Sequence, residues 1–247
     1  MAMEPVTVTI GNFFFRFRNQ VFPLVILALF LMRAPALPAV DGDTIGRLRE
    51  AVALLSVFCG LGLRALVIGY AYIQRGGRNR RVYAKNLVTE GMFGVCRNPL
   101  YVGNMLLYFG LFLFHGNPAV VVTGTCLFFF IYHCIVFAEE DFLSEKFGEA
   151  YDRYRADVPR WWMRWSNFAA ATQGMRFSLL RVLAKDYSTI AAAAFAVIAT
   201  EIYRIAFSDI AGQRTPYLVL LALAMLAVGV ATAVTSYLKR SGALEEA

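Results

Sequence analysis

An all-helical protein that crosses a membrane several times is the fold class that this sequence predicts. Three observations lead to this prediction. The 247 residues are 59% hydrophobic, with a mean hydropathy of +0.56, which is more apolar than a water-soluble domain can bury. Several apolar runs approach the roughly 20 residues that a helix needs to cross a bilayer. Basic residues gather in the short segments between these runs, as is typical of loops on the cytoplasmic side.

Six apolar runs are candidates for membrane-spanning helices, at approximately residues 13–32, 48–73, 99–114, 119–138, 187–207 and 216–237. Arg33 stands between the first run and any cleavage site, which favours an uncleaved helix over a signal peptide. Asn117-Pro118 is a helix-start pair between the third and fourth runs, so we expect residues 99–138 to form a helical hairpin. We predict a single membrane domain over residues 1–247, in which residues 187–237 form an additional C-terminal helix pair.

Six spans place both termini on one side of the membrane, together with the most basic loop of the chain. That loop carries five basic residues: Arg75, Arg78, Arg80, Arg81 and Lys85. The opposite side holds four arginines together with three aspartates: Arg33, Arg47, Arg49, Arg214, Asp41, Asp43 and Asp209. This asymmetry predicts a multi-pass protein of the bacterial inner membrane with its basic side in the cytoplasm. The net charge of +7 therefore follows from topology, and we expect no nucleic-acid partner because the basic residues are not interleaved with aromatic ones.

A few polar residues lie inside the apolar runs. Arg64 is one of them, and an intramembrane charge indicates either a functional site or a structural pair; both interpretations remain open. Glu201 and Arg204 are spaced to pair on one helix face. The cysteines (Cys59, Cys96, Cys126 and Cys134) form no C-x-x-C pair, so we expect reduced thiols. No metal site is expected, because His115 and His133 lie far apart without carboxylates at ligand spacing.

The stretch from Leu87 to Gly103 carries the densest signals for chemistry. Asn98 is a natural N-cap and Pro99 suits the first position of a helix. The amide donors of a helix start, next to the guanidinium of Arg97, would attract an anion. The sequence therefore predicts an anion site at the membrane boundary.

A second polar element follows the fourth apolar run, where Glu139 and Glu140 stand at the open end of the predicted hairpin, on the same side as Arg97. An amphipathic helix over residues 142–158, with a possible break near Gly148, is expected on the cytoplasmic side. These elements suit a ligand that carries both an anionic and a cationic group. The alternative is that Arg97 and Glu140 form a salt bridge that only holds the hairpin ends together, and pattern alone leaves both open.

The motifs of residues 80–160, taken in order, resemble a known superfamily. They are Leu87-Val88-Thr89-x-Gly91, Arg97-Asn98-Pro99-x-Tyr101-x-Gly103, Gly116-Asn117-Pro118, Glu139-Glu140-x-x-Leu143, and Phe147-Gly148-x-x-Tyr151-x-x-Tyr154 with Val158. Each motif is weak, but their order and spacing are similar to those of the isoprenylcysteine carboxyl methyltransferases and phospholipid N-methyltransferases. This resemblance implies membrane helices that close over S-adenosylmethionine at the cytoplasmic boundary, with a lipid or small lipophilic acceptor that enters from the bilayer.

The resemblance also implies roles for individual residues. Glu140, with Glu139 as a possible second carboxylate, would receive the amino group of the cofactor. An ammonium acceptor would first have to lose a proton, and Glu139 and Tyr154 are the candidates for this step by their position in the sequence. The implied cofactor-binding residues are Leu87, Val88, Thr89, Gly91, Arg97, Asn98, Tyr101, Gly103 and Glu140. The implied catalytic residues are Arg97, Glu139 and Tyr154.

Two departures from the family pattern matter. Asn98 stands where the family often has a histidine, so an acid or base role at that position is absent. Residues 135–138 lack the arginine that the isoprenylcysteine branch carries before its acidic pair, which argues against a prenylcysteine acceptor. Two alternatives of other classes remain: a reductase that uses NADPH, like the sterol reductases, and a non-catalytic membrane scaffold. The acceptor and the oligomeric state are not predicted.

Overall fold

The computed structural model describes residues 5–39, 43–70, 84, 86–207 and 214–244, and within these ranges the chain is helical without strands. Five helices are long and apolar enough to cross a membrane, and a shorter apolar helix of 17 residues joins them. The six long helices are α1 (Pro5–Met32), α2 (Thr44–Tyr70), α3 (Pro99–His115), α4 (Pro118–Phe147), α7 (Leu179–Ala206) and α8 (Arg214–Arg240). They correspond to the six predicted spans, and the predicted fold class is confirmed.

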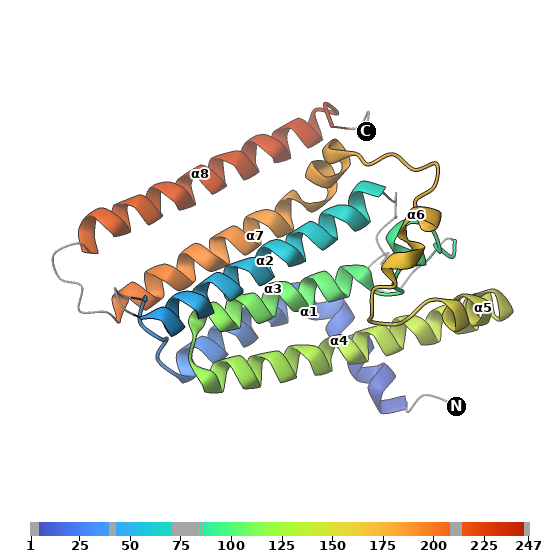
Figure 1. Cartoon of the computed structure of the whole chain (residues 1–247), viewed down its shortest axis with the longest axis horizontal. Coiled ribbons are helices and arrows are strands. Elements are labelled where there is room, and N and C mark those ends of the chain that lie inside the picture. The colour runs from blue at the N-terminus through green and yellow to red at the C-terminus, as the bar shows by residue number, and fades with distance from the viewer. Residues whose placement is uncertain (1–4, 40–42, 71–83, 85, 208–213, 245–247) are drawn as a thin grey trace.

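Four short helical elements lie near one end of the bundle (Figure 1). They are η1 (Gly91–Gly94), α5 (Glu149–Asp157), η2 (Trp165–Asn167) and α6 (Phe168–Ala171). The start of α1 and the end of α8 lie toward this same end in Figure 1, as an even number of spans requires. The basic loop with Arg75, Arg78, Arg80, Arg81 and Lys85 lies outside the described residues, as do Asp41 and Asp209. The cytoplasmic orientation therefore stays a prediction.

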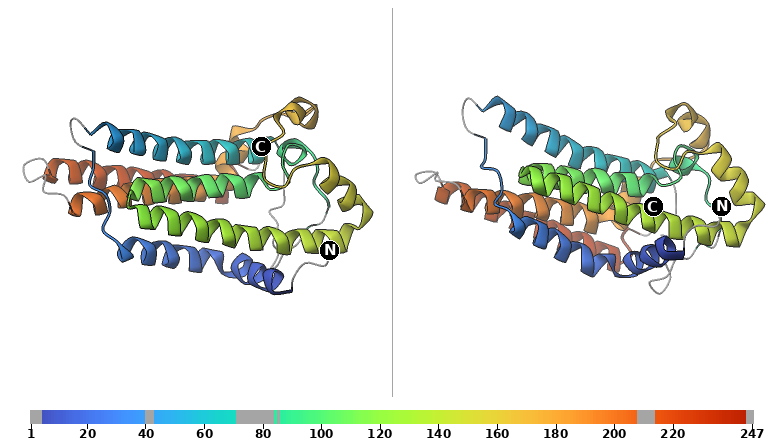
Figure 2. Two further views of the ribbon diagram at one scale, coloured as in Figure 1. Left: turned by 60° about the horizontal axis from the view of Figure 1, so that its bottom comes forward. Right: turned by 90° about the horizontal axis from the view of Figure 1, so that it is seen from below.

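The long helices pack side by side (Figure 2), with α1 against α4, α4 against α3, α3 against α2, and α7 against both α2 and α3. Aromatic rings fill the interface of α1, α3 and α4, where the rings of Phe22 and Phe128 lie 5.0 Å apart. The predicted C-terminal pair is α7 and α8, which pack against each other. None of the described side chains of α8 is buried, which suits a helix whose outer face contacts lipid.

Small residues allow α2 and α3 to approach closely. A β-carbon added at Gly103 would lie 3.0 Å from the carbonyl oxygen of Gly60 and 2.8 Å from Cγ of Arg64. One added at Gly110 would lie 2.6 Å from the carbonyl oxygen of Ala53. Helices in membranes commonly pack through such small residues because their backbones can then come together.

The predicted helix starts are confirmed, but one predicted cap is wrong in its detail. Helix α3 begins at Pro99, yet the Asn98 side chain makes no capping hydrogen bond. The carbonyl of Asn98 instead accepts from the amides of Tyr101 and Val102, which leaves fewer free amide donors at this helix start than expected. The side chain of Asn117 does cap α4, by accepting a hydrogen bond from the amide of Ala119 at 3.1 Å.

Helix α4 continues beyond the predicted end of the fourth span at residue 138 and reaches Phe147. The apolar pattern that defines a span stops at the acidic pair, but nothing there breaks a helix until Gly148, which has a φ of 50°. The predicted break near Gly148 is confirmed, and α5 begins directly after it. Glu139 and Glu140 consequently project from the middle of a continuous helix.

The predicted pairing of Glu201 and Arg204 is confirmed at the other end of the bundle. A nitrogen of the Arg204 guanidinium lies 2.9 Å from the Glu201 carboxylate, and Arg204 also pairs with Glu50. It donates to the carbonyls of Ala36 and Leu37 at 3.0 Å each. Arg204 thus joins α7, α2 and the chain that leaves α1.

Candidate functional site

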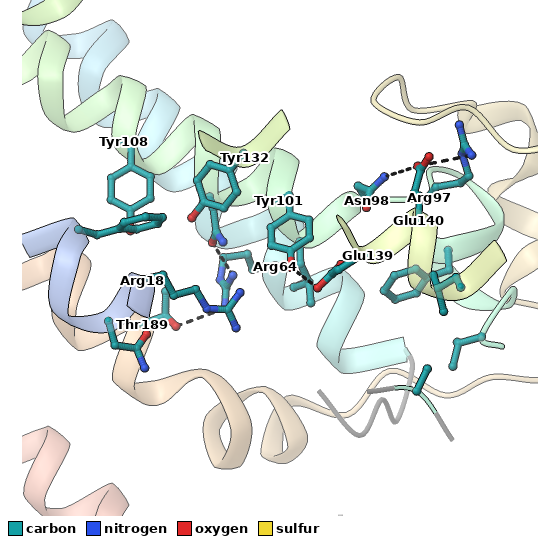
Figure 3. Close-up of a pocket in the computed structure, with 18 of the residues that line it drawn as sticks. Arg18, Arg64, Arg97, Asn98, Tyr101, Tyr108, Tyr132, Glu139, Glu140 and Thr189 are labelled. Carbon is teal, nitrogen blue, oxygen red and sulfur yellow. Dashed lines mark hydrogen bonds and ion pairs between the residues drawn. The ribbon is translucent and has the colours of Figure 1, made fainter. Parts of the chain in front are cut away.

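A cavity of about 860 Å³ lies between α1, α2, α3, α4, α5 and α7, at the end of the bundle where residues 86–98 form part of its wall. Its volume is within the range of roughly 300–1,000 Å³ that is typical of small-molecule sites. Eight of the residues predicted for the site line this cavity: Leu87, Val88, Arg97, Asn98, Tyr101, Glu139, Glu140 and Tyr154. The structure therefore brings together most of the residues that the sequence motifs pointed to (Figure 3).

Three other predicted cofactor-binding residues are not in the cavity wall. Thr89 is exposed to the outside of the protein. Gly91 is buried with a φ of 62° at the start of η1, a backbone conformation that favours glycine. Gly103 lies at the crossing of α2 and α3. In the structure the two glycines shape the backbone around the cavity, and no role for Thr89 emerges.

Residues 91–98 are held in place by packing against α2 and by backbone hydrogen bonds with residues 159–164. Met92 and Val95 are fully buried against Leu63 and Val67 of α2. The amide of Arg97 donates to the carbonyl of Pro159 at 2.9 Å, and residues 95 and 164 are joined in the same way at 3.0 Å. Residues 159–164 therefore run beside the segment that carries Arg97 and fix its position.

At one end of the cavity, Glu140 is surrounded by donors. Its carboxylate lies 2.7 Å from Nη2 of Arg160 and 3.4 Å from Nη1 of Arg97. The side-chain amide of Asn98 donates to it at 3.4 Å. Because two guanidinium groups contact one carboxylate, the net charge at this end of the cavity is positive. The predicted Arg97–Glu140 pair is present, and an ammonium group would have to share Glu140 with both arginines or displace one of them.

Glu139, the neighbouring carboxylate on α4, faces a different part of the cavity (Figure 3). The hydroxyl of Tyr101 donates to it at 2.5 Å. Arg18 of α1 and Tyr132 of α4 line the same part of the cavity, and the rings of Tyr101 and Tyr132 lie 5.4 Å apart. Successive helix residues point about 100° apart, which is why the two carboxylates serve separate polar clusters.

Arg64, the intramembrane charge, is both paired and part of the cavity wall. Its guanidinium makes a two-pronged contact with Asp186 of α7, at 2.5 Å and 2.9 Å. It also donates to Asn104 at 2.6 Å and to Thr189 at 3.2 Å. The sequence interpretation missed Asp186 as a partner because the predicted span began at residue 187, one position later, so this aspartate lay at the edge of the span.

Tyr154, a predicted proton acceptor, donates its hydroxyl hydrogen to the carbonyl of Phe93 at 2.8 Å. Burial raises the pKa of Tyr154 far above its ordinary value, which keeps the phenol protonated. In this arrangement Tyr154 holds η1 in place, and it would have to release that bond before acting as a base. Burial likewise raises the pKa of the neighbouring Cys96 thiol to about 11.

Two arginines that touch the site were not predicted for it. Arg18 interrupts the first apolar run of the sequence, and no local spacing connects it with Glu139. Arg160 begins a basic and aromatic stretch, residues 160–165, of a kind that is typical of the lipid headgroup layer, whereas its guanidinium binds Glu140. Contacts between residues so distant in sequence follow from the fold, and no motif signals them.

The orphaned polar atom in the cavity wall belongs to Arg97. Its Nε is buried and has no hydrogen-bond partner among the described residues, although its Nη1 pairs with Glu140. An unpaired buried donor is costly unless a ligand satisfies it. The cavity therefore fits a small molecule that carries a carboxylate or another anionic group next to Arg97.

Comparisons with known proteins agree with this location. Residues 50–150 match the family model described as phospholipid methyltransferase. The chain is also 34% identical over 80 residues to the cobalt-zinc-cadmium resistance protein CzcN of Cupriavidus metallidurans, a match that covers 32% of this chain and 37% of that protein. The chain thus spans little more than a third of the length of this relative. No solved structure matches the chain.

Proposed function

We propose that this protein, whose residues 50–150 match the phospholipid methyltransferase family model, is an S-adenosylmethionine-dependent methyltransferase that acts on a lipid or another lipophilic acceptor. The family match indicates a membrane methyltransferase and confirms the resemblance in the sequence motifs. The methyl donor, the class of acceptor and a site on the cytoplasmic face are parts of the proposal.

The observation that carries the proposal is the cavity of about 860 Å³ next to Arg97. Its walls include Leu87, Arg97, Glu139 and Glu140, all from the segment that matches the family. A purely structural Arg97–Glu140 pair would need no cavity beside it, and Nε of Arg97, which has no hydrogen-bond partner among the described residues, is a donor that a ligand could use. The positive balance around Glu140 suits the carboxylate of an amino-acid moiety better than it suits an isolated ammonium.

S-adenosylmethionine supplies a methyl group on a sulfonium that is open to in-line attack. The residues of the chain would mainly position the reactants and exclude water. Arg97 would bind the carboxylate of the donor, and Arg160 would hold Glu140 in a fixed orientation through its two-pronged contact. Glu139, in contact with the Tyr101 hydroxyl, is the group placed to take a proton from an ammonium acceptor.

Calorimetry on the purified protein in detergent tests the proposal, with S-adenosylmethionine and S-adenosylhomocysteine as ligands and NADPH as the comparison. We expect both sulfur compounds to bind and NADPH not to bind. Arg97→Ala should weaken binding by about tenfold or more, because a hydrogen bond to a charged group contributes about 1.5–3 kcal/mol. Arg153→Ala, at an exposed position of α5, is the matched control and should bind like the wild type.

Two outcomes would overturn the proposal. Binding of NADPH alone would favour the reductase alternative. Absence of binding by any of the three ligands, with Glu140→Gln altering only thermal stability, would favour the scaffold alternative. Equal affinities for wild type and Arg97→Ala would leave the activity possible but remove Arg97 from the site.

A further inference from the structure

A second cavity, of about 530 Å³, extends from the first one toward the other end of the bundle, between α1 and α7. We call it the apolar slot. Alkyl and aromatic side chains dominate its lining, and the polar exceptions are uncharged: Asn104, Tyr108, Thr189, Thr200 and Tyr203. A charged group would lose its hydration there without compensation, so the slot is suited to the uncharged part of a ligand.

The apolar slot adjoins the polar cavity. Six residues line both: Phe22, Pro23, Asn104, Tyr108, Thr189 and Ala192. At this junction Arg64 donates to Asn104 and Thr189, so the change from polar to apolar lining occurs at a defined level. A ligand that reaches across the junction would place one end near Glu139 and the other among aliphatic groups.

The apolar slot is also open to the surrounding bilayer. Leu27 and Leu31 of α1 line it, yet they are 55% and 67% exposed. Ala192 and Ala199 of α7 line it and are exposed as well. Helix α1 packs mainly on α4, whereas α7 packs on α2, α3 and α8. The two walls therefore face each other across the opening.

The apolar slot is long enough to hold a hydrocarbon chain of one leaflet. Its lining on α7 runs from Thr189 to Tyr203, which corresponds to roughly 21 Å along a helix at 1.5 Å per residue. One leaflet contributes about half of the roughly 30 Å thickness of the hydrocarbon core. The apolar slot is therefore somewhat longer than the depth of one leaflet, so a hydrocarbon chain that crosses one leaflet fits along its length.

We propose that the apolar slot binds one hydrocarbon chain of the methyl acceptor and holds its reacting end in the polar cavity; this inference rests on the proposed methyltransferase function. Four alanines of α7 leave room for the chain: Ala192, Ala193, Ala196 and Ala199. They lie outside residues 50–150, the segment that matches the family. Helix α7 therefore determines which chains fit, while the matched segment forms most of the polar cavity.

A photoaffinity experiment tests this proposal on the full-length protein in nanodiscs. The probe is palmitate that carries a diazirine in its chain, and cross-linked peptides are identified by mass spectrometry. We expect labelling at Leu27, Leu31 and residues 192–199. Ala196→Phe should fill the apolar slot and reduce this labelling at least fivefold, and Ala193→Leu should reduce it to a lesser degree. Ala227→Phe, at an exposed position of α8, is the control and should leave the labelling unchanged.

Calorimetry with S-adenosylmethionine separates this proposal from the one on which it rests. We expect Ala196→Phe to bind the donor like the wild type, because the substitution lies away from Arg97, and this also verifies that the variant folds. One outcome would overturn the inference of an acceptor slot and leave the proposed function standing. In that outcome the protein binds the donor, but the label spreads evenly over the lipid-facing helices, including α8, and is equal in all variants. If the wild type does not bind S-adenosylmethionine, the proposed methyltransferase function is overturned instead.

Discussion

Asp186→Asn removes the negative charge that balances Arg64 in the middle of the helix bundle. The two side chains are 6% and 2% exposed, and their closest contact is 2.5 Å. The substitution keeps the shape of the residue but leaves a guanidinium with only neutral partners, Asn104 and Thr189. Removal of one partner from a buried pair costs about 3–5 kcal/mol of unfolding free energy. Because two hydrogen bonds remain, we expect the lower end of that range, about 3 kcal/mol.

Thermal unfolding in detergent, followed by circular dichroism, measures this effect. The matched control is Asp152→Asn, which breaks the half-exposed ion pair with Arg155 on α5 and should cost no more than about 1 kcal/mol. A double variant, Arg64→Met with Asp186→Leu, removes both charges and should recover most of the lost stability, since a buried pair can often be replaced by apolar residues.

The result that would refute this reasoning is a small effect. If Asp186→Asn unfolded as readily as Asp152→Asn, within about 1 kcal/mol, the Arg64–Asp186 contact would not hold α7 against α2. Failure of the double variant to recover stability would mean that the loss arises from packing and not from the uncompensated charge.

Two further predictions concern packing and pH. Gly103→Ala places a methyl group 3.0 Å from the carbonyl oxygen of Gly60 and should lower the free energy of unfolding by about 1–3 kcal/mol. Thermal unfolding in detergent measures this change. The control is Gly62→Ala, which has open space around it and should be neutral. Burial raises the Cys96 pKa from 9.0 to about 11, so the folded state holds this proton more tightly than the unfolded chain. The contribution of this proton to the free energy of unfolding is fully present below pH 9.0 and is lost as the pH rises toward 11. Cys96→Ala should therefore make the free energy of unfolding depend less on pH between 9.0 and 11. Identical pH profiles for wild type and variant would contradict this prediction.

Local signals in the sequence were sufficient for the helices and for eight residues of the cavity wall. The helix starts at Asn98-Pro99 and Asn117-Pro118 and the break at Gly148 all rest on the conformational preferences of single residues, which do not depend on the rest of the fold. The proximity of Arg97 to Glu140 followed from hairpin geometry, because a short turn brings the open ends of two helices together.

The contacts that could not be predicted join segments far apart in the chain. Arg160 reaches Glu140, and Arg64 reaches Asp186 across 122 positions. Hydropathy only divides residues between spans and loops. On this basis Asp186 lay at the edge of a predicted span, and Arg160 belonged to a stretch typical of the lipid headgroup layer. Which buried charges meet depends on how the helices pack, and no periodicity in one helix carries that information.

The contacts of Tyr203 and Arg204 have a consequence for motion. The hydroxyl of Tyr203 donates to the carbonyl of Phe30 at 3.1 Å, and Arg204 holds the carbonyls of Ala36 and Leu37 directly after α1. These bonds join α1 and α7 at the end of the bundle remote from Arg97. If the two helices separate, they must therefore rotate about this joined end. The gap between them would then be widest beside the polar cavity. A molecule entering between them would meet the largest opening at the level where its polar end has to pass.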